Sequence, residues 1–250
     1  MILLLQGVAW LLDPANWADS ATPGLLSQLL GQLGITLASI VVAVVVAVPL
    51  GVLIGHTGRG RLVAIVASNA ARALPTLGLF SVVVIALTLD PQWLAPVIPL
   101  ALLGIPPLLA GTYAGIEAVD GQVVDAARAM GMTEWQVLLR VEIPLGAPLI
   151  VGGLRAAVLQ TVATATLASF YGFTTIGNSI LLGPDSNQYI PMIGGSLLVT
   201  VLALAIDGLF ALLQRSSAPR GVSRGARRTT NAARGRFITS PAGTPISRGN

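Results

Sequence analysis

Long apolar stretches without a single charge are the dominant pattern along this chain. No Asp, Glu, Lys or Arg occurs in residues 20–58, 91–115, 156–184 or 186–206. An uncharged apolar run of more than about 18 residues is typical of a helix that crosses a membrane. The pattern therefore predicts an all-α polytopic membrane protein.

Polar turns divide these stretches into five membrane-spanning helices. We expect the helices at residues 29–55, 62–89, 93–115, 144–170 and 189–213. The apolar stretch 2–12 is too short to cross about 30 Å of hydrocarbon. Because Trp10 and Trp17 flank it, we interpret it as a helix lying at the membrane interface, with a sixth span as the alternative.

The composition argues against several classes of site. Of the 250 residues, 54% are hydrophobic and only 10% are charged, with no Cys and a single His, His56. Thiolate metal sites and disulfides are therefore excluded, and one His argues against a His-based metal site or a catalytic triad. No Walker-type phosphate loop is present. We expect no enzymatic activity, and no metal or cofactor bound by this chain.

Positive charge is concentrated after the last apolar run. Eight of the fourteen Arg residues lie between Arg215 and Arg248, with no acidic residue among them. Basic residues mark the cytoplasmic segments of membrane proteins, so we place this end and the turn at 56–61 in the cytoplasm. Membrane orientation accounts for the charge, and we expect the lipid bilayer rather than nucleic acid as a partner.

These patterns predict three regions. Residues 1–28 form an interfacial N-terminal segment, and residues 29–214 form a transmembrane domain with a cytosolic loop at 117–143. Residues 215–250 are rich in Arg, Gly, Ser, Thr and Pro and cannot bury enough apolar surface to fold, so we expect a disordered basic tail. The organisation predicts a multi-pass protein of the cell membrane with a cytoplasmic C-terminus.

The cytosolic loop carries the most specific motif of the chain. It reads Asp125-Ala126-Ala127, three residues, Gly131, nine residues, and Val141-Glu142-Ile143-Pro144. We expect two short helices, the first capped by Asp120 and the second by a capping box of Thr133 and Gln136. Gly131 suits a positive φ between them, and Pro144 suits the first turn of the next span. Such a knob is shaped to dock into a groove of another protein.

The motif resembles the Glu-Ala-Ala loop of the membrane subunits of ABC importers. That pattern is Glu-Ala-Ala, three residues, Gly, nine residues, Ile-x-Leu-Pro, from which Asp125, Val141 and Ile143 are conservative departures. Residues 72–77 and 103–113 further resemble permeases of glycine betaine, choline and related osmoprotectant importers. Residues 170–177 depart from the Gly-rich segment that such permeases carry after the fourth span.

The resemblance implies a five- or six-helix permease core and a set of partners. These are cytosolic ABC ATPase subunits that use ATP, an extracytoplasmic substrate-binding protein, and a second permease copy or paralogue. It also implies that the loop contacts the ATPase through Asp125, Ala126, Ala127, Gly131 and Pro144.

Three charged residues fall inside the predicted spans. Arg72, Arg155 and Asp207 each lie roughly 12–16 Å from a cytoplasmic end at about 1.5 Å per residue. Charges within a bilayer pair with one another or face water. We hypothesise that Asp207 pairs with Arg72 or Arg155 near a cytoplasmic gate, where Pro75 interrupts a helix, and that the unpaired Arg repels cationic solute. The alternative is that the helices extend into the cytosol and the charges lie at the head groups.

Other interpretations stay open. A stand-alone secondary transporter or channel is the alternative function, although no internal repeat is visible. His56 is interpreted as a solvated turn residue rather than a ligand or pH sensor. Four aromatic residues near the outer face fit an interfacial belt better than a cage for quaternary ammonium groups. They are Phe170, Tyr171, Phe173 and Tyr189.

Overall fold

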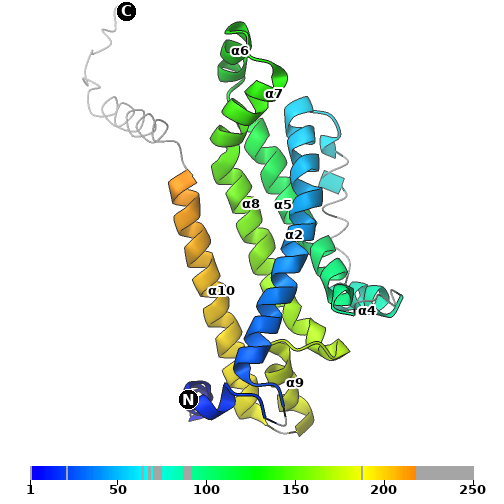
Figure 1. Ribbon diagram of the computed structural model, residues 1–250, viewed down its shortest axis with the longest axis vertical. Coiled ribbons are helices and arrows are strands. Elements are labelled where there is room, and N and C mark those ends of the chain that lie inside the picture. The colour runs from blue at the N-terminus through cyan, green and yellow to red at the C-terminus, as the bar shows by residue number, and fades with distance from the viewer. Residues whose placement is uncertain are drawn as a thin grey trace, which may run out of the picture. The chain divides into compact units, whose positions relative to one another are not determined.

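The computed structural model describes residues 2–20, 22–62, 65–66, 69, 75–86, 92–186 and 188–217. These residues belong to one compact unit that ends at Ser217. They form helices joined by short turns, with no β-strand in the described ranges (Figure 1).

Nine α-helices are described along the chain. They are α1 (Ile2–Leu12), α2 (Leu25–Thr57), α4 (Thr76–Ala86), α5 (Leu94–Glu117), α6 (Gly121–Ala129), α7 (Glu134–Val137), α8 (Ile143–Ala165), α9 (Gly177–Ser186) and α10 (Tyr189–Ser217). A π-helical turn, η2 (Leu138–Glu142), continues α7 into α8, and two 3-10 turns are η1 (Pro14–Asn16) and η3 (Thr166–Tyr171).

Four helical segments are long and apolar enough to cross a membrane. They are Leu25–Thr57, Leu94–Glu117, Glu134–Tyr171 and Tyr189–Ser217. Each contains or closely overlaps a predicted span. The predicted span at 62–89 is described only in part, at residues 62, 65–66, 69 and 75–86, and α4 is the longest helix among these residues. The stretch 2–12 forms α1, which at 11 residues is shorter than a full span.

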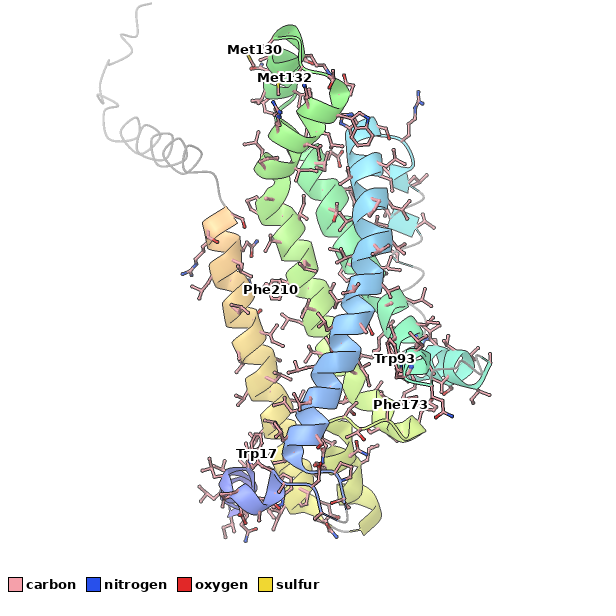
Figure 2. All side chains as sticks on the ribbon, in the orientation of Figure 1. Trp17, Trp93, Met130, Met132, Phe173 and Phe210 are labelled. Carbon is pink, nitrogen blue, oxygen red and sulfur yellow. The ribbon has the colours of Figure 1, made fainter. Side chains whose placement is uncertain are left out.

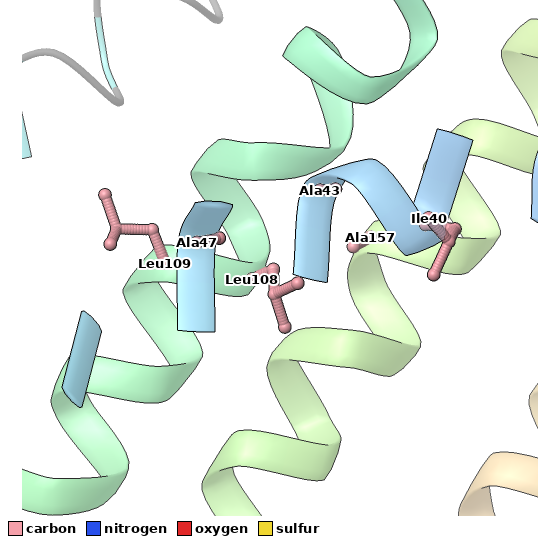
Figure 3. Close-up of a cluster of buried hydrophobic side chains, with 6 residues drawn as sticks. All are labelled: Ile40, Ala43, Ala47, Leu108, Leu109 and Ala157. Atoms are coloured by element: carbon pink, nitrogen blue, oxygen red, sulfur yellow. The ribbon is translucent and has the colours of Figure 1, made fainter. Parts of the chain in front are cut away.

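The central helix of the bundle is α5, which packs along α2 on one side and α8 on the other (Figure 1). A buried apolar cluster fills the junction of the three helices, and Figure 3 shows its members. They are Ile40, Ala43, Ala47, Leu108, Leu109 and Ala157. Half of these residues are Ala, because small side chains let membrane helices approach closely enough to gain van der Waals contact.

The backbones of α5 and α8 approach each other closely at two pairs of glycines. A Cβ atom built on Gly153 would lie 2.8 Å from the Cα atom of Gly111. Gly115 and Gly146 face each other further along the same pair of helices. No side chain larger than hydrogen fits between these backbones without moving them.

We therefore expect Gly153→Val to lower the unfolding temperature of the purified protein by several degrees. Overpacking of a tight interface costs about 1–3 kcal/mol. Gly208→Val is the matched control, because no atom lies within 4 Å of a Cβ built at that position in α10. Equal melting temperatures for the two variants would show that α5 and α8 are not in close contact.

The outer aromatic residues separate into two pairs. Tyr171 stacks on Phe80 with ring centroids 5.2 Å apart, and Phe173 packs against the same buried cluster as Phe80. Phe170 and Tyr189 are exposed. Tyr171 and Phe173 therefore join η3 and its following turn to α4 and α5, and the interfacial belt stays a prediction. Phe80 lies far from Tyr171 in the sequence, so no local pattern predicts that the two rings stack.

Candidate functional site

The loop between α5 and α8 folds as two short helices around a glycine elbow, at the top of Figure 1. The Asp120 side chain caps α6 by accepting a hydrogen bond from the Gln122 N–H at 2.9 Å. Beyond the end of α6, Gly131 has a φ of 85°. Its N–H donates to the Arg128 carbonyl at 2.9 Å, and the Met132 N–H donates to the Ala127 carbonyl at 3.3 Å. This pair of bonds is a Schellman motif, and the predicted positive φ is confirmed.

The second helix begins with the predicted capping box. The Gln136 N–H donates to Thr133 Oγ1 at 3.4 Å, and the Thr133 N–H donates to Gln136 Oε1 at 3.0 Å. From there the helix does not stop. It runs through η2 into α8, so Pro144 is the second residue of a continuing helix rather than the start of a separate one. The wider π turn lies directly before the proline, which has no N–H to donate.

The Asp-Ala-Ala residues divide between the surface and the interior of the loop. Ala127 is buried with Val124 and Val137 in a small core that ties α6 to α7. Asp125 and Ala126 are exposed. The Ala127 side chain packs inside the loop itself, whereas Asp125 and Ala126 are open to a partner, and the contact of these residues with an ATPase stays a prediction.

Large apolar side chains that the motif did not indicate are exposed on the same loop. Met130 at the elbow and Trp135 on α7 are more than 70% exposed, and Val123 on α6 is 44% exposed. Figure 2 places Met130 and Met132 at the tip of the loop. The sequence could have indicated this surface, because large apolar residues in an otherwise charged loop are typical of a binding site.

Ion pairs brace the two helices of the loop. Arg128 on α6 donates to both carboxylate oxygens of Glu134 on α7, at 2.9 and 3.0 Å, and to Asp125 at 3.4 Å. The hydrogen bonds from Arg128 hold the pKa of Glu134 below its usual value, so this carboxylate is ionised near neutral pH. The loop therefore has a fixed internal geometry.

The loop also contacts the end of α2 through His56. His56 Nδ1 lies 2.7 Å from Glu142 Oε2, and His56 Nε2 lies 3.3 Å from Glu134 Oε2. The His56 side chain is 18% exposed and that of Glu142 is 7% exposed. The interpretation of His56 as a solvated turn residue is therefore wrong. Glu142 is 86 positions away, and no sequence pattern connects the two.

A second ionic contact joins α8 to α10 within the spans. Arg155 Nε and Nη2 donate to the two Asp207 carboxylate oxygens, each at 2.7 Å. Gln214 accepts from Arg155 at 3.5 Å and donates to the Pro148 carbonyl at 3.0 Å. The predicted pairing of Asp207 is confirmed, with Arg155 as its partner.

Two further residues of the gate hypothesis have different outcomes. Arg72 lies outside the described residues. Pro75 directly precedes α4 and is exposed, and its carbonyl accepts from the Leu79 N–H at 2.9 Å. Because Asp207 neutralises Arg155, repulsion of cationic solute by an unpaired Arg can apply only to Arg72. A role of these residues in a pathway or gate stays a prediction.

The family model for binding-protein-dependent transport system inner membrane components matches residues 47–218. The chain belongs to this family. Membership decides between the two functions that the sequence left open, in favour of the importer permease. The matched region contains the whole loop between α5 and α8 and both members of the Arg155–Asp207 pair.

Several named relatives resemble this permease over most of its length. The glycine betaine/carnitine/choline transport system permease protein OpuCB of Bacillus subtilis is 33% identical over 190 residues, covering 76% of this chain and 87% of the relative. The choline transport system permease protein OpuBB of the same organism is 32% identical, covering 80% and 91%. The carnitine transport permease protein OpuCB of Listeria monocytogenes is 30% identical, covering 79% and 90%.

Solved structures of ABC transporters share the fold. An inward-facing MetNI methionine ABC transporter aligns with a TM-score of 0.70 and 19% identity, covering 78% of this permease and 96% of that chain. An amino acid ABC transporter with histidines aligns with a TM-score of 0.61 and 22% identity, covering 77% and 93%. The predicted all-α permease fold is confirmed, and the permease is a multi-pass membrane protein.

Proposed function

We propose that this permease imports quaternary ammonium osmoprotectants such as glycine betaine, choline or carnitine. The observation that carries the proposal is the sequence similarity to permeases for these compounds, which align with three quarters or more of the chain. In this proposal a cytosolic ATPase uses ATP, an extracytoplasmic binding protein delivers the solute, and a second permease copy or paralogue completes the pathway. The permease itself performs no covalent chemistry.

The cytosolic loop is the proposed contact with the ATPase. Val123, Ala126 and Met130 present small and flexible apolar groups at the end of a braced helix pair. A rigid pair of helices transmits the movement of a bound partner to the span to which it is connected. Because α7 continues through η2 into α8, that span is α8. Asp125, Ala126 and Gly131 therefore act at the contact, while Ala127 and Pro144 act on the shape of the loop.

The loop, the end of α2 and the end of α10 are proposed to face the cytoplasm together. The His56–Glu142 contact joins the end of α2 to the base of the loop. The hydrogen bond from Gln214 to the Pro148 carbonyl joins the last turns of α10 to the start of α8. Because these contacts place the loop and the end of α10 at the same end of the bundle, a cytosolic loop implies a cytoplasmic C-terminal tail.

Single cysteines in this cysteine-free chain test the orientation. A cysteine at Ser20 is expected to react in intact cells with a thiol reagent that cannot cross the membrane. Cysteines at Gly121 and Ser223 are expected to react only after permeabilisation. Labelling of the Ser223 position from outside would contradict the proposed orientation.

Uptake of radiolabelled solutes tests the substrate class. The permease is co-expressed with candidate ATPase and binding-protein subunits from the same genome, in a host without osmoprotectant uptake. We expect ATP-dependent, saturable uptake of betaine, choline or carnitine, and no uptake when the ATPase cannot hydrolyse ATP. Uptake of none of the three, or uptake that does not need ATP, would overturn the proposal.

A further inference from the structure

His56 faces two carboxylates at once, one with each ring nitrogen. The distances are 2.7 Å from Nδ1 to Glu142 and 3.3 Å from Nε2 to Glu134. A neutral imidazole has one N–H, so it can donate to only one of these oxygens. The second contact then places a nitrogen lone pair against a carboxylate oxygen unless another proton is present. The geometry is that of an imidazolium ion between two anions.

Glu142 depends on His56 more than Glu134 does. Its side chain is 7% exposed, and in the part of the chain that the structure describes its one hydrogen bond comes from His56. An ionised carboxylate in such a position is costly without a charged or donating partner. Glu134, by contrast, is 57% exposed and is also held by Arg128. Loss of the second proton therefore leaves Glu142 as the unsatisfied group.

These polar contacts are not backed by close apolar packing between α2 and α7. A cavity of about 470 Å³ lies beside them. Its lining consists of Pro49, Val52, Leu53, His56, Glu134, Trp135 and Leu138. Polar contacts next to a cavity are easier to separate than interlocked side chains, because little dispersion energy is lost when they part. The His56 contacts therefore determine how firmly the loop is attached to α2.

We propose that His56, as an imidazolium ion, is the positioning residue that fixes the segment between α5 and α8, residues 118–142, to the cytoplasmic end of α2. This segment is then held at low pH and released from α2 as pH rises. The inference rests on the proposed function of this loop as the ATPase contact.

The charges around the imidazole support this sign of the pH dependence. Glu134 and Glu142, both on the segment from α7 to η2, are the carboxylates within ion-pair distance of His56 among the described residues. Arg128 of α6 reaches His56 only through Glu134. On the side of α5, Glu117 is engaged by Arg61 at 2.7 Å. Two carboxylates and no directly paired cation face the ring, so each ring nitrogen has an acceptor opposite it, and the imidazolium ion supplies a donor to both.

Spin-label distances on the isolated permease test the proposal without any ATPase. Thr57→Cys and Met130→Cys introduce the only two thiols, at exposed positions on α2 and the loop elbow. In lipid nanodiscs we expect a single narrow distance distribution at pH 6 and a broader one at pH 8.5. With His56→Gln the distribution is expected to be broad at both pH values.

Two further variants separate positioning from mere folding. His56→Arg carries a permanent charge and is expected to keep the narrow distribution at pH 6 and at pH 8.5. Glu117→Gln removes a carboxylate from an exposed ion pair at the same end of the molecule and is expected to leave the pH response unchanged. Identical distributions at both pH values in the parent and in His56→Gln would overturn the proposal. So would a broad distribution for His56→Arg at pH 6.

The distance measurement is independent of the proposed function. If the distances respond to pH but the loop does not bind an ATPase, the proposed function fails and the positioning role of His56 stands. If the ATPase binds and the distances do not change, the positioning role fails alone.

Discussion

Gly131→Val is expected to reduce transport by more than tenfold while the permease still inserts and folds. Gly131 has a φ of 85°, a region in which a β-branched residue is strained by about 1–3 kcal/mol. No atom lies within 4 Å of a Cβ built there, so the effect comes from the backbone and not from a clash. The strain opens the two Schellman hydrogen bonds and turns α6 away from α7. Co-purification of the ATPase and uptake of labelled solute measure the loss.

A graded series gives this experiment its control. Gly131→Asn is expected to keep most of the activity, because Asn tolerates the left-handed region, and Gly131→Ala is expected to lie between Asn and Val. Gly121→Ala, in the first turn of α6 with open space around it, is expected to behave as the parent. Full transport by Gly131→Val would show that the elbow does not position the docking surface.

Asp207→Asn is expected to lower the amount of folded permease several-fold. The substitution leaves Arg155 without the carboxylate that receives its two short hydrogen bonds within the spans of α8 and α10, so that only the 3.5 Å bond to Gln214 is kept. An unpaired guanidinium at this depth must be solvated by water or head groups, which strains the contact between the two helices. Size-exclusion profiles and melting temperatures of the purified protein measure the effect.

The reciprocal change provides the decisive comparison. Arg155→Gln combined with Asp207→Asn replaces the ion pair with two neutral amides, and we expect it to recover part of the loss. Glu117→Gln, which breaks the exposed ion pair with Arg61, is expected to have little effect, as surface pairs contribute little. A double variant no better than Asp207→Asn would contradict an energetic coupling between Arg155 and Asp207.

The features that the sequence predicted correctly depend on neighbouring residues. A span is visible because hydrocarbon thickness requires an uninterrupted apolar segment, and four such helices lie at the expected positions. The caps at Asp120 and Thr133 and the positive φ at Gly131 are also local, since each involves groups two to five residues apart. The resemblance to ABC importers rested on the same short stretch of chain, and the narrower resemblance to osmoprotectant permeases rested on residues 72–77 and 103–113.

Only the tertiary structure decided which faces of the helices meet. Membrane helices are apolar nearly all round, so their hydropathy does not mark the buried face as it does in a soluble protein. Arg155 rather than another Arg as partner of Asp207, and Tyr171 stacked on Phe80, both depend on helix rotation. The same reason applies to His56. Its contacts with Glu134 and Glu142 form only because the end of α2 packs beside the base of the loop, and the spacing of these residues along the chain does not predict that packing.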